Sequence, residues 1–350
     1  MKKSKILSLF LFIALLLGMC TFVCGCKFFH KETPETSIAT AQKSGYAQYS
    51  DKLWCITFQM VWDEFRNTIL EGKKVEFVDG NPPVADDLNK GIYSKDLVSE
   101  DSYYLVADEI SPELKTKIEK AIEAKFHEKS DILHLINWNL KDAYLFYTML
   151  IKNFNFPVAF DELKSEPFNN SNNNVKFFGI DKSSDKQLYK NVTVLFYNNN
   201  EYAVKLNTKE DEDVIIYRTD KQDSFTKLYD YVASNSKEDV FTKYDTLKIP
   251  NINVDVLISY SELIGKKIKY TPYIISQALQ TIKFKLNNKG GKLKSEAAIV
   301  LNKAAMPMME PPKERHFDFD KQFVLFLKEN YKDKPYYAMR VSDLSYLEKD

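Results

Sequence analysis

The chain has 350 residues, of which 44% are hydrophobic, and its 49 basic and 49 acidic side chains give a formal net charge of 0 at pH 7. A balanced charge excludes the basic footprint of a nucleic-acid-binding protein. Low glycine and proline contents, 10 and 12 residues, exclude a repetitive or largely disordered chain, and the apolar content is sufficient for a large core.

The N-terminus has the pattern of a targeting segment. Basic residues precede an apolar run at residues 6–23, and the tetrapeptide that ends at Cys26 resembles a bacterial lipobox. We therefore expect residues 1–25 to be a lipoprotein signal peptide and Cys26 to be lipidated, which places the chain outside the cytoplasm on the cell membrane. An uncleaved membrane anchor is the alternative. Residues 26–48 are polar and are predicted to be a tether.

The cysteines exclude a disulfide framework. Cleavage after residue 25 would leave Cys26 and Cys55, and lipidation of Cys26 would leave one thiol. The same cleavage removes three lysines and no acid, so the formal charge changes from 0 to −3. Cys55 lies in an apolar run beside Trp54, and we expect it to be a buried structural cysteine rather than a reactive thiol.

Residues 49–140 are predicted to be rich in helix, because apolar side chains recur at intervals of three and four residues. One of these helices has a clear start signal: Ser111 can cap it, Pro112 suits its first position and Glu113 suits its first turn. The expected elements are helices at residues 54–69, 111–126 and 132–138, with a short strand at residues 75–78.

From about residue 141 the pattern changes to strands rich in β-branched and aromatic residues. Asparagines at residues 198–200 predict a hairpin turn, and Pro250 suits the end of a strand. Residues 157–168 are predicted to be a loop, and residues 169–174 a polar turn. The expected elements are strands at 175–180, 192–197, 202–206, 214–217, 247–254, 281–286 and 323–327, a helix at 224–233 and a Gly-Gly turn at 290–291.

Patterns that would indicate catalysis or metal binding are weak. His30, His127, His134 and His316 lack further ligands at metal-site spacing. Residues 211–213 are acidic but lack the alternating ligands of a calcium loop. The sequence also lacks a phosphate-binding glycine loop, a nucleophile elbow and a Cys-x-x-Cys pair. We therefore expect a protein that is not an enzyme and needs no metal or cofactor.

Residues 295–309 combine a strand-like segment with a stiff end. Small or apolar side chains lie at every second position from Ser295 to Leu301, so that one face could be buried in a sheet. The sequence Met-Pro-Met-Met-Glu-Pro-Pro at residues 306–312 cannot continue a central strand. Such a segment could start outside a sheet and join it as a new strand once it is freed.

Residues from about 140 to 345 resemble the second half of a serpin, a member of a family of serine protease inhibitors. Ser295-Glu296-Ala297-Ala298 is similar to the family's hinge motif Thr-Glu-Ala-Ala. The other segments that resemble the family, in the family's order, are residues 156–161, 202–217, 247–250, 278–286, 317–326 and 337–341.

The resemblance implies a suicide-substrate inhibitor of a serine protease, with Met308–Met309 as the bait bond. Met308 would fill the pocket of an elastase- or chymotrypsin-like enzyme, whose own nucleophile would form the acyl bond. The sequence departs from the inhibitory pattern at Lys294, where glycine is usual, and at residues 299–301, which are bulky. Residues 27–140 do not match the family's helical half.

The expected fold is α+β and serpin-like, with mixed β-sheets, N-terminal helices packed on them and an exposed reactive-type loop. Residues 49–345 are predicted to form one domain, with a divergent α-rich part at 49–140 and a β-rich part at 141–345. We expect a monomer whose partners are a serine protease and, through the lipid, the membrane. Two other functions stay open: a non-inhibitory lipoprotein that binds a ligand or partner, and a structural protein of the cell envelope.

Overall fold

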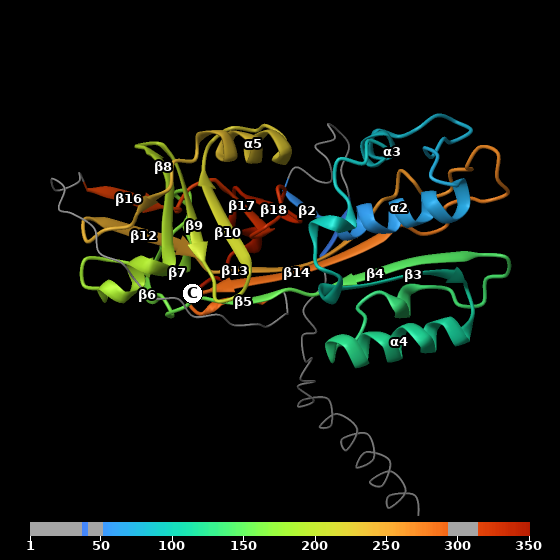
Figure 1. Ribbon diagram of the computed structural model, residues 1–350, viewed down its shortest axis with the longest axis horizontal. Helices are drawn as coiled ribbons and strands as arrows, with labels where there is room; N and C mark the ends of the chain where they lie inside the picture. Colours follow the sequence, from blue (N-terminus) through green and yellow to red (C-terminus); the bar gives the residue numbers. More distant parts are fainter. Residues whose placement is uncertain (1–36, 41–51, 293–313) are drawn as a thin grey trace, which may run out of the picture. The chain divides into compact units, whose positions relative to one another are not determined.

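Figure 1 shows a computed structural model of the chain, which describes residues 37–40, 52–292 and 314–350. Residues 37–350 form one compact unit. Within the described ranges, no helix is both long and apolar enough to span a bilayer. The expected lipidation site Cys26 and the segment 293–313, which holds the expected hinge and bait, lie outside the described residues.

The largest sheet is antiparallel, and it contains the predicted hairpin at residues 198–200 between β8 and β9. The strands predicted at 192–197, 202–206, 214–217 and 323–327 are confirmed, each slightly longer than expected. The strand order is β11 (Asp239–Val240), β8 (Val192–Asn198), β9 (Glu201–Asn207), β10 (Glu212–Arg218), β17 (Phe323–Glu329), β18 (Tyr337–Val341) and β2 (Leu53–Cys55).

The five-stranded sheet has the order β1 (Ser37–Thr40), β13 (Ile252–Ser259), β14 (Leu279–Asn287), β15 (Gly290–Lys292) and β5 (Asn153–Asn155). The predicted Gly-Gly turn is wrong, because Gly290 and Gly291 are strand residues of β15 and the turn precedes them. Glycine is required there by close packing. A Cβ atom on Gly290 would lie 2.2 Å from the carbonyl oxygen of Phe154, and one on Gly291 would lie 2.2 Å from the Phe154 ring.

The four-stranded sheet has the order β16 (Arg315–Asp318), β12 (Asp245–Pro250), β7 (Asn174–Ile180) and β6 (Asp161–Pro167). The loop predicted at 157–168 is therefore wrong, since β6 occupies most of it. The strand predicted at 247–254 is two strands in different sheets, and the first ends at Pro250, as its missing N–H group favours.

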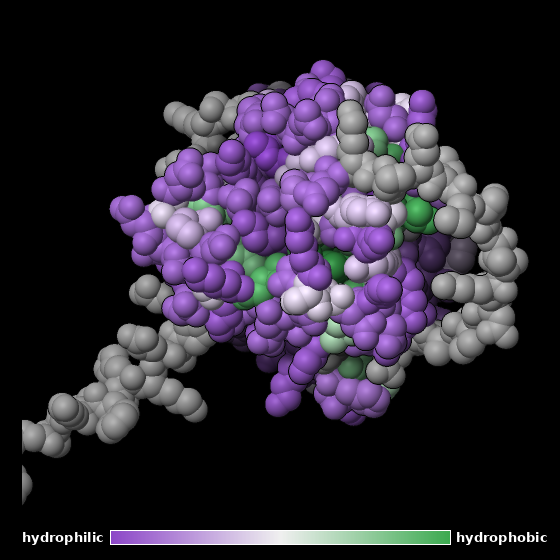
Figure 2. All heavy atoms as spheres, turned by 90° about the vertical axis from the view of Figure 1, so that its left-hand side faces the viewer, coloured by the Kyte–Doolittle hydropathy of each residue, from purple (hydrophilic) through white to green (hydrophobic). Residues whose placement is uncertain are grey.

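Hydrophilic residues cover most of the face at the left of Figure 1, with small separate apolar patches (Figure 2).

The antiparallel pair of β3 (Tyr103–Glu109) and β4 (Tyr144–Leu150) is packed between two helices (Figure 1). On one face lies α2 (Thr57–Leu70), whose Phe65 ring is 5.5 Å from that of Phe146. On the other lies α4 (Pro112–Phe126), whose apolar side chains pack with Tyr147. The predicted start of α4 is confirmed, since the Ser111 hydroxyl accepts a hydrogen bond from the N–H of Leu114.

Two predicted helices differ from the structure. The helix expected from residue 54 begins at Thr57, because Trp54 pairs with β18 in strand β2. The helix expected at 132–138 is a single 3-10 turn at Leu133–Leu135. Side chains bond the backbone there instead: Ser130 accepts from the N–H of Leu133, and Trp138 donates to the Leu133 carbonyl. The remaining helices are α3 (Pro83–Leu88), α5 (Phe225–Asn235) and the 3-10 turns Lys95–Leu97, Glu100–Ser102, Lys186–Asn191 and Leu344–Tyr346.

A buried ionic cluster joins β4 and β5 to the seven-stranded sheet. Lys152, in the link between the two strands, bonds Glu212 at 2.7 Å and also bonds Glu329, and all three side chains are buried. The Tyr336 hydroxyl donates to Glu212, and the N–H and hydroxyl of Ser99 donate to Glu329. The cluster therefore fixes the end of β4 from which β5 continues.

Candidate functional site

Two free strand edges face each other in the middle of the molecule. β14 pairs with β13 along its whole length, but among the described residues its other edge pairs only at 285–287, with β15. β4 pairs with β3 on one side, and within the same part of the chain no strand lies on its other side. A cavity of about 390 Å³ separates the two edges, lined by residues 146–151 and 279–283. We call the space between these edges the strand gap.

A second cavity of about 430 Å³ continues the strand gap toward the start of β4. The two cavities share Phe58, Val61, Phe146 and Leu279 in their walls. Most of the other side chains that line the second cavity are apolar. Many of them come from α2, β4 and residues 272–278. The strand gap is therefore open at one end into an apolar space.

The buried polar side chain at the floor of the strand gap, Gln280, has hydrogen-bond partners within the protein. The side chain of Gln280 is buried, and its amide donates to Thr57 Oγ1 at 2.7 Å and to the Cys55 carbonyl at 3.1 Å. Its oxygen accepts from the Tyr260 hydroxyl at 2.8 Å. Cys55 is buried, as predicted, and burial raises the pKa of its thiol, which suits a structural cysteine.

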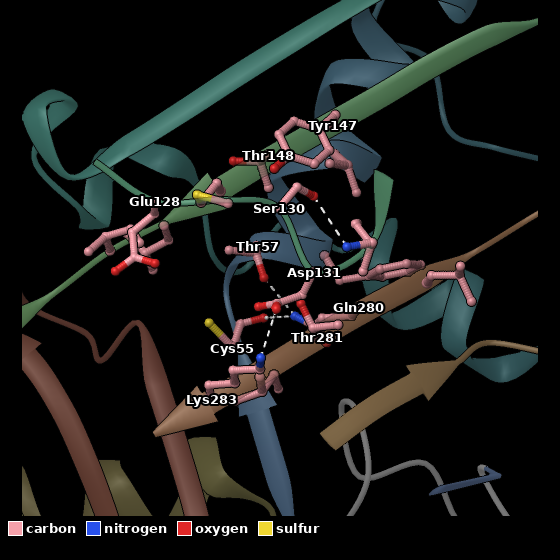
Figure 3. Close-up of a pocket in the computed structure, with 18 of the residues that line it drawn as sticks. Cys55, Thr57, Glu128, Ser130, Asp131, Tyr147, Thr148, Gln280, Thr281 and Lys283 are labelled. Carbon is pink, nitrogen blue, oxygen red and sulfur yellow. Dashed lines mark hydrogen bonds and ion pairs between the residues drawn. The ribbon is translucent and has the colours of Figure 1, made fainter. Parts of the chain in front are cut away.

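The segment that follows α4 is attached to β14 by side chains. Lys283 Nζ lies 2.7 Å from Asp131 Oδ1 (Figure 3). The amide of Gln277, just before β14, donates to the Leu135 carbonyl at 3.0 Å. Burial opposes the charged form of Lys283, but the hydrogen bond and charge of Asp131 outweigh it and raise the pKa of Lys283. Because residues 128–132 also line the cavity, this segment lies over the strand gap.

The sequence is matched by no family model and by no curated protein. Serpin48, a highly specific serpin of the insect Tenebrio molitor, is 12% identical with a TM-score of 0.41, over 82% of this chain and 97% of that one. A complex of thyroxine-binding globulin with thyroxine is 11% identical with a TM-score of 0.47, over 85% and 94%. A serpin of the trematode Schistosoma haematobium is 14% identical with a TM-score of 0.41, over 67% and 64%.

The chain is similar to serpins. At identities of 11–14% this likeness concerns the fold alone. The predicted α+β class, with several sheets and packed helices, is confirmed by the elements of the fold themselves.

The residues that the serpin resemblance points to lie outside the described part of the chain. These are the hinge Ser295, Glu296, Ala297 and Ala298, and the bait residues Met308 and Met309. Among the described residues no three His, Cys, Asp or Glu side chains are grouped as a metal site would need. What the structure adds is the strand gap, which Lys283, Asp131 and Gln280 line.

Sequence reasoning missed these wall residues for two reasons. The strand signal at 281–286 was correct but gave no sign that one edge is unpaired. The segment after α4 was expected to be a helix, so a contact between Asp131 and β14 was not anticipated.

The bond between Asp131 and Lys283 is expected to contribute little to global stability. Both side chains are about half exposed, at 44% and 50%. Asp131→Asn should therefore lower the free energy of unfolding by less than about 1 kcal/mol, measured by urea denaturation. Asp255→Asn is the matched control, since Asp255 lies 3.8 Å from the same Nζ. A loss of several kcal/mol for Asp131→Asn alone would contradict the role of this segment as a weakly held cover.

Proposed function

We propose that the protein is a serpin-like suicide-substrate inhibitor of an elastase- or chymotrypsin-like serine protease, with Met308–Met309 as the bait bond. The observation that carries this proposal is the strand gap and its position relative to β15. β15 already lies between β14 and β5 and pairs with both, and residue 293 follows it directly. A strand that continues β15 would enter the gap.

A strand that continues β15 in the same register would have a defined neighbour for each residue. Lys292 lies opposite Lys285 on one side and opposite Asn153 on the other. Counting on along both antiparallel neighbours would put Ser295 between Ile282 and Leu150. In the same way Ala297 would lie between Gln280 and Thr148, and Ile299 beside Phe146. The two neighbours therefore give one consistent register for residues 293–299.

This register also selects the face that each side chain would occupy. Gln280 and Ile282 are buried, whereas Thr281 between them is half-buried and Lys283, the next residue, is exposed. Directly opposite residues in a sheet share a face, so Ser295, Ala297 and Ile299 would point into the core. These are the small and apolar positions, while Lys294 and Glu296 would lie on the opposite face, which Lys283 shares and which residues 128–132 cover. The alternation of the segment thus fits the gap.

Insertion would be favourable because both edges of the strand gap offer unpaired backbone groups. Each added ladder hydrogen bond contributes about 0.5–1.5 kcal/mol net, and a full strand would add several. The acyl bond to Met308 would form first, with the protease nucleophile attacking the Met308 carbonyl and releasing the amine of Met309. Insertion faster than hydrolysis would then keep the protease bound.

Incubation of residues 37–350 with an elastase-like protease, followed by a denaturing gel, tests the proposal. We expect a covalent complex of protease and protein, and a change of protease preference when Met308 is replaced. Clean cleavage after Met308 with full protease activity retained would overturn inhibition while leaving the fold unaffected.

The apolar cavity at the end of the strand gap favours a second candidate, a non-inhibitory protein that binds a small apolar ligand. Its volume of about 430 Å³ and its mainly apolar lining suit such a ligand. In that case an apolar fluorescent probe should bind the protein before and after loop cleavage alike. Release of the probe on cleavage would instead indicate that a strand fills the gap.

A further inference from the structure

Residues 264–275 form a hairpin whose second arm also lines the apolar cavity at the end of the strand gap, and which we call the lysine hairpin. Its arms are joined by hydrogen bonds from the Gly265 N–H to the Ile275 carbonyl at 2.8 Å and from the Ile268 N–H to the Tyr273 carbonyl at 3.1 Å. Ile268 is buried, so the hairpin is anchored in the core.

A neighbouring segment holds the lysine hairpin in place. Phe77 forms a bridge with Ile268, and the Val78 N–H donates to the Lys267 carbonyl at 2.9 Å. The Lys269 N–H donates to the Glu76 carbonyl at 2.8 Å. The hairpin is therefore a fixed surface rather than a free loop, and Val78 belongs to the same surface.

This surface gathers exposed apolar side chains. Of the eight large hydrophobic side chains that are exposed among the described residues, four lie here: Val78, Ile264, Tyr270 and Ile274. Tyr270 is 98% exposed, with a left-handed backbone at φ 62°, which is costly for a residue other than glycine. The fold thus keeps a tyrosine fully in solvent at the tip of the hairpin.

The charges on the same surface are mainly basic. The lysine hairpin holds Lys266, Lys267 and Lys269 and contains no acidic residue. Lys269 lies 3.1 Å from Glu76 of the neighbouring segment, which also contributes exposed Lys73 and Lys74 and the exposed acids Glu71 and Asp79. Five lysines thus stand against three carboxylates on this surface. Lysines beside exposed tyrosine and isoleucine suit the interface of a lipid bilayer, where long basic side chains reach phosphate groups and aromatic rings lie at headgroup level.

We propose that the lysine hairpin and Val78 form a docking surface for an anionic lipid membrane. A protein partner is less well matched, because lysine is depleted at the centre of protein interfaces. Anionic headgroups complement the lysines, and Ile264, Tyr270 and Ile274 would enter the boundary between headgroups and acyl chains. The lipid expected on Cys26 would hold the protein at such a surface, but the proposal does not depend on it.

Co-sedimentation of residues 37–350, which form one compact unit, with phosphatidylcholine vesicles with and without phosphatidylglycerol tests the proposal. We expect binding to the vesicles that contain phosphatidylglycerol, and weakening as salt increases. Lys266→Gln with Lys267→Gln should weaken binding roughly 25-fold, at about fivefold for each lysine. Tyr270→Ser should weaken it at least about fivefold through loss of the buried ring.

Matched controls separate the surface from general effects of charge and hydrophobicity. Tyr331→Ser removes another exposed tyrosine, 69% exposed, and Lys186→Gln with Lys190→Gln removes two other exposed lysines. These variants should bind as the parent does. Equal losses in the controls, equal binding to neutral vesicles, or no binding to either vesicle would overturn the proposal. None of these outcomes depends on cleavage of the segment 295–309, so the inhibitor proposal is tested separately.

Discussion

Ala297→Lys is expected to change the protein from a protease trap into a protease substrate. In the proposed register Ala297 lies on the core face of the strand gap, between Gln280 and Thr148. Gln280 is buried and fully hydrogen-bonded to the floor, so a lysine beside it would be buried without a partner. Insertion should fail while the acyl bond at Met308 still forms and is hydrolysed. The measurement is the yield of covalent complex on a denaturing gel.

Glu296→Lys is the matched control for Ala297→Lys. It introduces the same side chain one residue earlier, on the face toward residues 128–132, which are exposed or half-buried. It should therefore retain most of the covalent complex. Equal loss in both variants would contradict the assigned faces, and equal retention in both would contradict insertion of this segment into the strand gap.

Lys152→Met is expected to lower the free energy of unfolding by about 3–5 kcal/mol, because it leaves two buried carboxylates without their cation. Lys152, Glu212 and Glu329 are each at most 5% exposed. Urea denaturation measures the change. Lys328→Met is a matched control: it also removes a largely buried lysine, but Lys328 pairs with Asp213 at a more exposed site. A loss below about 1 kcal/mol for Lys152→Met would contradict the anchoring role of the cluster.

The two carboxylates of this cluster should respond differently to loss of charge. Burial raises the pKa of Glu212, and Lys152 only partly offsets it. Burial also acts on Glu329, but hydrogen bonds from Lys152 and Ser99 outweigh it and lower the pKa of Glu329. Glu329→Gln should therefore cost more stability than Glu212→Gln at neutral pH.

The same pKa directions fix the sign of the pH dependence. The contribution of Glu329 is present above its ordinary pKa and is lost as pH falls through its lowered folded pKa. Ionised Glu212 costs stability at neutral pH, and that cost disappears as pH falls through its raised pKa. As pH falls, Glu212 therefore adds stability above the ordinary carboxyl pKa, and Glu329 loses stability below it. Glu212→Gln should therefore steepen the loss of stability on acidification, measured by urea denaturation at several pH values.

Much of the β-rich half could be predicted because its strands are long and carry strong local signals. Residues 192–217 hold three strands joined by short turns, and their content of β-branched and aromatic residues is readable from the sequence alone. The helix at Pro112–Phe126 was predicted at both ends because serine and proline mark its start.

The parts that could not be predicted depend on contacts far apart in the chain. β6 carries charged residues such as Glu162 and Lys164, so its strand character comes from pairing with β7 rather than from its own sequence. Trp54 is apolar and fits a helix pattern, but it pairs with Ala338 of β18 and is therefore a strand residue. The strand gap exists because β4 and β14 each lack a neighbouring strand along one edge among the described residues. No local sequence pattern shows whether a strand edge is paired.

The central claim is that residues 293–301 enter the strand gap after cleavage, and amide hydrogen exchange tests it most directly. Exchange should be compared in residues 37–350 before and after cleavage at Met308, in peptides that cover β4 and β14. The account predicts that the free edges of both strands become protected after cleavage, because their unpaired amides gain ladder hydrogen bonds. Unchanged exchange in Tyr144–Leu150 and Leu279–Asn287 after complete cleavage would contradict it.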